Sequence, residues 1–143
     1  MDHVFVYGTL KKGGWLHAHL EDATLVRVTT TRTPEWSLLN TGQYPAMVMG
    51  NAYVKGQVYE IPDTLLPRLD HVEGVPHLFK RERIQVDDWP FPVWGYVLAD
   101  PRHMDQTPTN EGKVIEWDVT SGTVAQAIRA LKDTSDIGTP SRK

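Results

Sequence analysis

The sequence predicts an α+β fold in which many short strands form a small mixed β-sheet or barrel flanked by short helices. Three observations lead to this class. Short runs rich in β-branched and aromatic residues recur along the chain, and glycine, proline or asparagine interrupts them. One segment among them, residues 63–73, has a clear helical period. The 143 residues, 40% of them hydrophobic and 23% charged, fit one globular domain with its own core.

Composition excludes several kinds of site and partner. The chain contains no cysteine, so disulfides, thiol nucleophiles and thiolate metal sites are excluded. A net charge of −3 without a dense Lys/Arg stripe gives no electrostatic support for nucleic-acid binding. No apolar run approaches the roughly 20 residues that a membrane helix needs, and the first residues lack the pattern of a signal peptide. We therefore expect a cytoplasmic protein with no nucleic-acid or membrane partner.

The N-terminal stretch His3–Leu10 contains the first candidate binding site. Val4–Val6 predicts a buried strand, and Gly8 breaks it. A strand that opens abruptly into a turn leaves main-chain N–H groups without ladder partners, and such groups can form a small anion-binding concavity. The alternative is an ordinary strand end that binds nothing, which is the commoner outcome for so short a motif.

The elements that follow are predicted from apolar runs and the turn residues between them. We expect a helical turn at 15–20, strands at 24–33, 36–39, 47–49, 53–60, 79–87, 93–98 and 114–117, and a loop at 100–113. The strands at 47–49 and 53–60 are predicted to be the two arms of a hairpin around Gly50-Asn51.

The segment 63–73 is the clearest helix, because its apolar residues share one face. Asp63 is a candidate N-cap, but Pro67 favours a helix that begins at Pro67 itself, after a tight turn. Gly74 is expected to end the helix as its C′ residue.

A second helix is predicted at 123–132, where apolar residues form a stripe. The segment 133–143 is rich in Ser, Thr, Gly and Pro and is expected to be a flexible tail. We therefore predict a single domain over 1–132.

Glu73 is the carboxylate that stands out. It ends the helix at 63–73 and follows Leu69 and Val72 of the apolar face, so it should be partly buried. Partial burial and the negative end of the helix dipole both disfavour the ionised form, so its pKa is expected to rise. Such a carboxyl suits general acid/base catalysis near neutral pH. The alternative is a solvated helix-end residue without a role, as most surface charges are.

Other patterns of catalytic or metal-binding residues are incomplete. The six histidines include no His-x-x-x-His or His-Glu-x-x-His run, so no metal site is predicted. A Gly-x-Ser-x-Gly elbow, a phosphate-binding loop and a dinucleotide fingerprint are also missing. The charged cluster at 80–83 predicts an exposed strand with cross-strand ion pairs, and Glu82 within it is interpreted as structural.

Three motifs occur in order along the chain: Val-Tyr-Gly-Thr-Leu at 6–10, Gln-Tyr-Pro-Ala at 43–46, and Leu-Asp-x-x-Glu-Gly at 69–74 followed by Phe79-x-Arg81. Together they resemble the γ-glutamylcyclotransferase-like family, and within it the group around γ-glutamylamine cyclotransferase and the AIG2-like proteins. The resemblance covers about residues 3–98. It implies a small mixed β-barrel flanked by helices and a reaction that uses no cofactor.

The resemblance also implies an enzyme. The α-amine of a small γ-glutamyl compound would attack its own γ-carbonyl, an acyl transfer that forms 5-oxoproline and releases an amine or amino acid in a lyase-like way. Glu73 would take a proton from the α-ammonium and return one to the leaving amine. The implied substrate-binding residues are Tyr7, Gly8, Thr9, Leu10, Tyr44 and Phe79, and Tyr96 is expected to be a further part of the pocket wall. Because nucleophile and electrophile share one molecule, ring closure needs orientation more than further functional groups.

The sequence departs from the family pattern in three places. Phe79 stands where the family usually has Tyr, His17 stands where relatives often carry Asn, and we place no family motif after about residue 100. Because of these departures, the sequence does not identify the leaving group of the substrate. A binding or regulatory module that keeps the pocket without turnover is the alternative function. A third interpretation is an interaction protein that uses its 123–143 segment. The oligomeric state is also open, with a homodimer as one option.

Overall fold

A computed structural model describes residues 1–14, 16–41, 44–100, 111–117 and 128–130 of the chain. The elements within them are β1 (Asp2–Val6), η1 (His17–Leu20), β2 (Thr24–Thr30), β3 (Trp36–Asn40), β4 (Pro45–Met49), β5 (Tyr53–Ile61), α1 (Leu65–Val72), β6 (Phe79–Ile84), β7 (Val93–Leu98), β8 (Val114–Trp117) and β9 (Ile128–Ala130). The predicted tail at 133–143 and most of the predicted loop at 100–113 lie outside the described residues. No helix in the described ranges is long and apolar enough to span a membrane.

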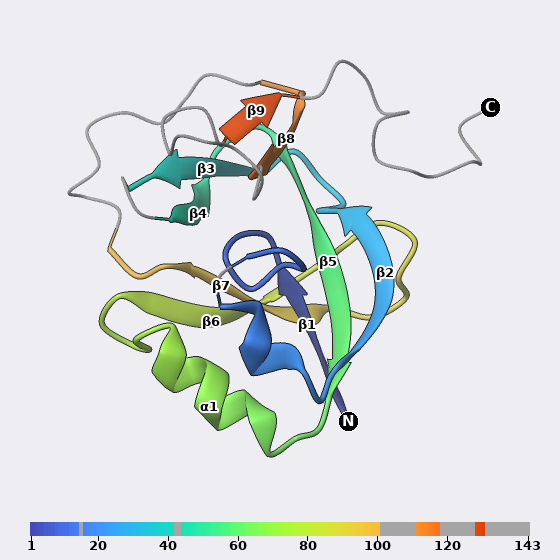
Figure 1. The fold of residues 1–143 in the computed structure, drawn as a ribbon. Helices are drawn as coiled ribbons and strands as arrows, with labels where there is room; N and C mark the ends of the chain where they lie inside the picture. The colour runs from blue at the N-terminus through green and yellow to red at the C-terminus, as the bar shows by residue number, and fades with distance from the viewer. Residues whose placement is uncertain (15, 42–43, 101–110, 118–127, 131–143) are drawn as a thin grey trace.

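The strands form one mixed sheet. Its main path runs β3-β4-β7-β1-β5-β8-β9, with β2 paired to β5 and β6 paired to β7. An isolated bridge between Trp36 and Ala52 brings the start of β3 back beside β5, so the sheet curls strongly (Figure 1). The predicted α+β fold, a small mixed sheet flanked by short helices, is confirmed. Among the described residues, however, no continuous ladder closes the sheet into a barrel.

Strand β1 lies inside the sheet and is covered on both faces. It pairs antiparallel with β5 and parallel with β7. Val4 and Val6 pack into the apolar cluster that includes Leu69 of α1, whereas Phe5 packs into a second cluster on the opposite face. A short continuous apolar run is what such a strand requires. Full burial of each such side chain contributes about 1.5–3 kcal/mol, so the end of β1 is a rigid support.

Helix α1 lies beside β6 (Figure 1), and it begins earlier than predicted. Its first residue is Leu65 and its N-cap residue is Thr64, so the predicted start at Pro67 and the predicted cap at Asp63 are wrong. Pro67 fits the first turn because an N–H at that position has no acceptor within the helix. The Asp63 carboxylate instead lies 3.0 Å from the N-terminal amine of the chain. Gly74 follows the helix with φ +68°, as predicted for C′.

Two other predictions of local structure are wrong. Strand β4 does not pair with β5 in a hairpin: it is antiparallel to β3 and meets β7 in parallel at Met47 and Val97. Residues Ile128–Ala130 form β9, antiparallel to β8, where the sequence predicts part of a helix. The remainder of that predicted helix lies outside the described residues. In both cases a non-local pairing decides the structure, and local periodicity does not identify the partner.

Gly56 is needed where β5 passes the end of β1. A Cβ at this position would lie 2.5 Å from the Val6 backbone oxygen and 2.6 Å from Cζ of Phe5. Because a paired backbone cannot move aside easily, we expect Gly56→Ala to lower the free energy of unfolding by about 1–3 kcal/mol.

Gly95→Ala is the matched comparison. The nearest atoms that its Cβ would meet belong to the Ile84 side chain, and the closest is the terminal Cδ1. A side-chain end shifts more easily than a paired backbone, so the loss of stability should be smaller. Urea denaturation of wild type and both variants measures the difference. A Gly56→Ala protein as stable as wild type would contradict this account of the β1–β5 crossing.

Candidate functional site

A cavity of about 150 Å³ lies where β1 ends, beside the C-terminal end of α1. Its lining includes every residue for which the sequence predicts catalysis or substrate binding: Tyr7, Gly8, Thr9, Leu10, Tyr44, Glu73 and Phe79, together with Tyr96. Most of the remaining lining is apolar, and the described residues that line the cavity include one carboxyl, that of Glu73, and no Lys, Arg or His. The fold thus brings these distant segments together, while the roles of the residues stay predictions.

One wall of the cavity is the turn that follows β1. The Lys11 N–H donates to the Gly8 oxygen at 3.0 Å, and the Gly14 N–H donates to the Lys11 oxygen at 2.8 Å. Within the described part of the chain, the N–H groups of Gly8, Thr9 and Leu10 donate to no protein acceptor. Main-chain N–H groups that are left over in this way can bind an anion or a carbonyl oxygen.

The second sequence motif packs directly against this turn. A Cβ on Gly8 would lie 2.6 Å from Cγ of Pro45, so only glycine allows the close approach. The next residue back, Tyr44, faces Phe79 with 5.9 Å between ring centroids. These two rings form an apolar wall, and Phe79 supplies no hydroxyl to it.

The opposite wall carries Glu73. This residue is the C-cap of α1, and its N–H donates to the Leu69 oxygen at 2.9 Å. Its carboxylate is partly buried and has no hydrogen-bond or ion-pair partner among the described residues. Burial without a compensating cation raises the pKa of Glu73 to about 7. The predicted upward shift of the pKa is therefore confirmed, with burial as its cause.

Two tyrosine hydroxyls hold the walls in place. The Tyr7 hydroxyl donates to the Tyr96 backbone oxygen at 2.7 Å and accepts from the Met47 N–H at 3.0 Å. The Tyr96 hydroxyl donates to Oδ1 of Asp70 at 2.8 Å. Burial raises the pKa of both phenols, so both hydroxyls keep their protons and remain donors. Asp70 lies one turn before Glu73 on α1, so the second bond ties that end of the helix to β7.

Arg81 completes this connection between α1 and the sheet. Its Nε lies 3.0 Å from Oδ1 of Asp70 as an ion pair, although its N–H does not point at the oxygen closely enough for a hydrogen bond. Sequence reasoning assigned no role to Asp70 or Arg81. The available signal was the i, i+3 spacing of Asp70 from Glu73, which places both on one side of the helix.

The charged cluster at 80–83 is arranged differently from the prediction of cross-strand ion pairs. Lys80 and Glu82 pair along the same strand at 2.9 Å. Arg81 and Arg83 stack on Trp94 of the neighbouring strand, with their Cζ atoms 4.3 and 3.8 Å from its ring centroid. Glu82 lies outside the cavity lining. Among the described residues, no group of three or more His, Asp or Glu side chains is placed to hold a metal ion.

Comparisons with known proteins identify a family for the chain. A family model described as "Gamma-glutamyl cyclotransferase, AIG2-like" matches residues 4–118. The match extends past residue 100 and includes β8, where sequence analysis placed no family motif. A Vibrio cholerae protein named as a candidate gamma-glutamylcyclotransferase is 36% identical over 106 residues, which cover 73% of this chain and 89% of that protein.

Two further relatives are more distant. The gamma-glutamylaminecyclotransferase of Rattus norvegicus is 32% identical over 95 residues, which cover 60% of this chain and 64% of that protein. A crystal structure of an AIG2-like protein from Mus musculus superposes with a TM-score of 0.65 at 24% identity, covering 78% of this chain and 87% of that one. The structural likeness confirms the fold that the motifs imply.

The raised pKa of Glu73 predicts a pH-dependent loss of stability. In the unfolded chain this carboxyl ionises near 4.5, but in the folded protein it ionises near 7. The folded state therefore holds the proton more tightly, and stability falls as pH rises from about 4.5 to about 7 and stays low above that range. Because one pKa unit corresponds to about 1.4 kcal/mol, we expect Glu73→Gln to be more stable than wild type by about 2–3 kcal/mol at pH 8.

At pH 4.5 the stabilisation by Glu73→Gln should largely vanish, because wild type is then protonated as well. Urea denaturation at the two pH values measures the difference. Glu82→Gln is the control, since Glu82 lies outside the cavity, and its effect on stability should not show this rise with pH. A Glu73→Gln effect of equal size at pH 4.5 and pH 8 would contradict the assignment.

Proposed function

The chain belongs to the AIG2-like gamma-glutamyl cyclotransferase family, and from this membership we propose that the protein converts a small γ-glutamyl compound into 5-oxoproline and a free amine or amino acid. Family membership supports gamma-glutamyl cyclotransferase activity in general. One observation carries the finer proposal: the carboxyl of Glu73, without a partner among the described residues, shares a cavity with N–H groups that donate to no described acceptor.

The proposed reaction uses Glu73 as its proton shuttle. The Glu73 carboxylate takes a proton from the α-ammonium of the substrate, and the freed amine attacks the γ-carbonyl carbon. A carbon–nitrogen bond forms to close the five-membered ring, and the bond to the leaving nitrogen breaks as Glu73 returns the proton to that nitrogen. The ring nitrogen still carries a second proton, which it gives to the released amine, so the products are 5-oxoproline and an ammonium. A carboxyl with a pKa of about 7 suits both steps, because it gains and loses a proton readily near neutral pH.

The turn at Gly8–Leu10 is proposed to bind the glutamyl part of the substrate. Its leftover N–H groups suit either the α-carboxylate or the oxyanion that develops on the γ-carbonyl. The rings of Tyr44 and Phe79 would limit the conformations of the chain between the two reacting atoms. Orientation of this kind is the main requirement when nucleophile and electrophile belong to one molecule.

The lining favours a particular class of leaving group. Among the described residues that line the cavity, Glu73 has the one carboxyl, and no Lys, Arg or His is there to receive a second carboxylate of the substrate. A leaving amine without a carboxylate therefore fits better than an amino acid. The name of the Rattus norvegicus relative, gamma-glutamylaminecyclotransferase, describes a substrate of this class for that protein.

Incubation with a panel of γ-glutamyl amines and γ-glutamyl amino acids tests the proposal. We expect equal amounts of 5-oxoproline and free amine, with γ-glutamyl amines turned over faster. The value of kcat/KM should rise with pH through about 7, since the ionised carboxylate accepts the first proton. Loss of a general base typically lowers the rate by about 100-fold or more, and we expect this for Glu73→Gln.

Glu82→Gln is the matched control, because it makes the same chemical change outside the cavity, and its kcat/KM should stay within about twofold of wild type. Undiminished turnover by Glu73→Gln would remove Glu73 from the mechanism. Thermal stabilisation by γ-glutamyl compounds without any product would contradict the enzyme and favour a binding module.

A further inference from the structure

We infer that Lys11 is a positioning residue, which sets the geometry of the turn at Gly8–Leu10 by anchoring it to β8. The expected effect on turnover rests on the proposed function, whereas the anchoring itself does not. Lys11 is not part of the cavity lining, so any influence on the site passes through the backbone of the turn.

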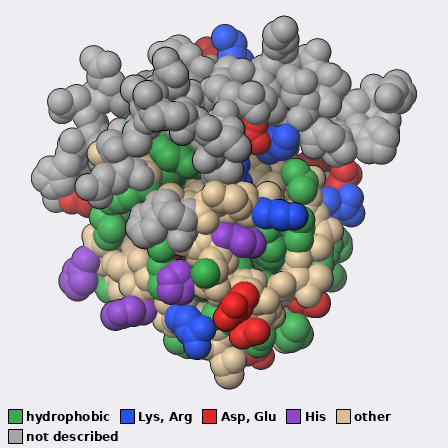
Figure 2. Space-filling model, viewed as in Figure 1, with side chains coloured by type: hydrophobic (Ala, Val, Ile, Leu, Met, Phe, Trp, Pro, Cys, Tyr) green, Lys and Arg blue, Asp and Glu red, His purple; other side chains and the backbone are tan. Residues whose placement is uncertain are grey.

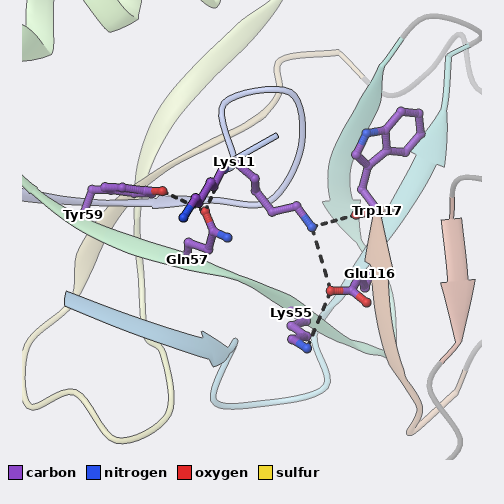
Figure 3. Close-up of polar contacts among 7 residues, drawn as sticks. Lys11, Lys55, Gln57, Tyr59, Glu116 and Trp117 are labelled. Atoms are coloured by element: carbon purple, nitrogen blue, oxygen red, sulfur yellow. Dashed lines mark hydrogen bonds and ion pairs between the residues drawn. The ribbon is translucent and has the colours of Figure 1, made fainter. Parts of the chain in front are cut away.

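The side chain of Lys11 is almost fully buried, with 6% of the residue exposed. Figure 3 shows it extending from the turn toward β8. Its Nζ donates to the Trp117 backbone oxygen at 2.6 Å and lies 3.9 Å from Oε2 of Glu116. An ammonium group is costly to bury unless acceptors and an opposite charge compensate for the lost water. These two partners therefore hold the Lys11 side chain in this position.

The backbone of Lys11 is equally constrained. Its N–H closes the turn that begins at Gly8, and its oxygen accepts from Gly14 to close the next turn. The peptide groups between Gly8 and Lys11 include the N–H donors of the cavity wall. Their directions consequently depend on where Lys11 is held, and the side chain fixes that point against a strand 106 positions away in sequence.

A second anchor holds the neighbouring residue. The Lys12 N–H donates to Oε1 of Gln57 at 3.1 Å. The Tyr59 hydroxyl donates to the same oxygen at 3.0 Å, and Figure 3 shows Tyr59 beside Gln57. This contact ties the outer part of the turn to β5. Without the Lys11 ammonium, the turn would keep its attachment to β5 but lose its attachment to β8.

Lys55 provides a matched control. Its Nζ lies 3.6 Å from the same Oε2 of Glu116, and Figure 3 shows it reaching that carboxylate from β5. Lys55→Met and Lys11→Met each remove one ammonium group beside the Glu116 carboxylate, and each keeps an unbranched side chain. Of these two lysines, only Lys11 belongs to the turn, so only Lys11→Met should affect the turn.

Amide hydrogen exchange tests the anchoring directly. In Lys11→Met we expect the amides at position 11 and at Gly14, which close the two turns, to exchange at least about tenfold faster than in wild type. In Lys55→Met they should exchange at the wild-type rate, and in Lys11→Arg, which keeps a charged donor, they should stay within about threefold of it. Unchanged exchange in Lys11→Met, or an equal increase in Lys55→Met, would overturn the inference.

The kinetic readout is a split between KM and kcat for the γ-glutamyl substrate that wild type turns over. We expect Lys11→Met to raise KM about tenfold, with kcat within about threefold and the pH midpoint near 7 unchanged, because Glu73 is untouched. Lys11→Arg should recover most of the loss. Wild-type values of both KM and kcat in Lys11→Met would overturn the positioning role.

Two outcomes separate this inference from the proposed function. If wild type releases no 5-oxoproline, the proposed function fails, but the exchange comparison still decides whether Lys11 holds the turn. If Lys11→Met does not fold, Glu116→Gln can replace it in the exchange experiment. This variant removes the charge that compensates the Lys11 ammonium and leaves the Trp117 carbonyl in place. Exchange at Lys11 and Gly14 should then rise about threefold, and an unchanged rate would overturn the inference.

Discussion

The burial of β1 on both faces and its pairing along both edges constrain everything else at the site. The strand cannot shift without disturbing β5 and β7 together, so the residues that follow it begin from a fixed point. Tyr7 extends this rigidity beyond the strand, since its hydroxyl joins backbone groups of Met47 and Tyr96 on two other strands. The turn and the aromatic wall are therefore positioned by the same buried strand. The hydrogen bond from the Tyr96 hydroxyl to Asp70 then attaches α1 to this assembly.

The contrast between two carboxylates on α1 explains why only one of them is chemically available. Asp70 has the Arg81 guanidinium and the Tyr96 hydroxyl beside it, so its charge is compensated and its role is to hold the helix. Glu73 lies one turn further on, and no cation or hydrogen-bond donor among the described residues reaches it. Burial then acts on Glu73 alone and brings its pKa to about 7. The stability lost as the pH rises from about 4.5 to about 7 is the cost of keeping this carboxyl in an apolar cavity.

Local sequence signals identified the parts of the site but not the long-range contacts that assemble it. The apolar run Val4–Val6, the helical period before Glu73 and the glycine that ends α1 are each visible within one short window. Each lies in the kind of element predicted for it, although α1 begins at Leu65 and not at Pro67. The pairing of β4 and the formation of β9 depend on contacts with other strands. The alternation of apolar and polar residues along a strand does not identify which strand will be its partner. No local pattern marks Lys11, because its partners at Glu116 and Trp117 are remote in sequence.

The contact of Lys11 with the Trp117 carbonyl also bears on how this protein can be shortened or its pocket transplanted. A fragment that stops after β7 would retain Glu73, the turn and the aromatic wall, yet the buried Lys11 ammonium would lose the Trp117 carbonyl and the Glu116 carboxylate beside it. The smallest unit that preserves the pocket geometry must therefore continue through Trp117.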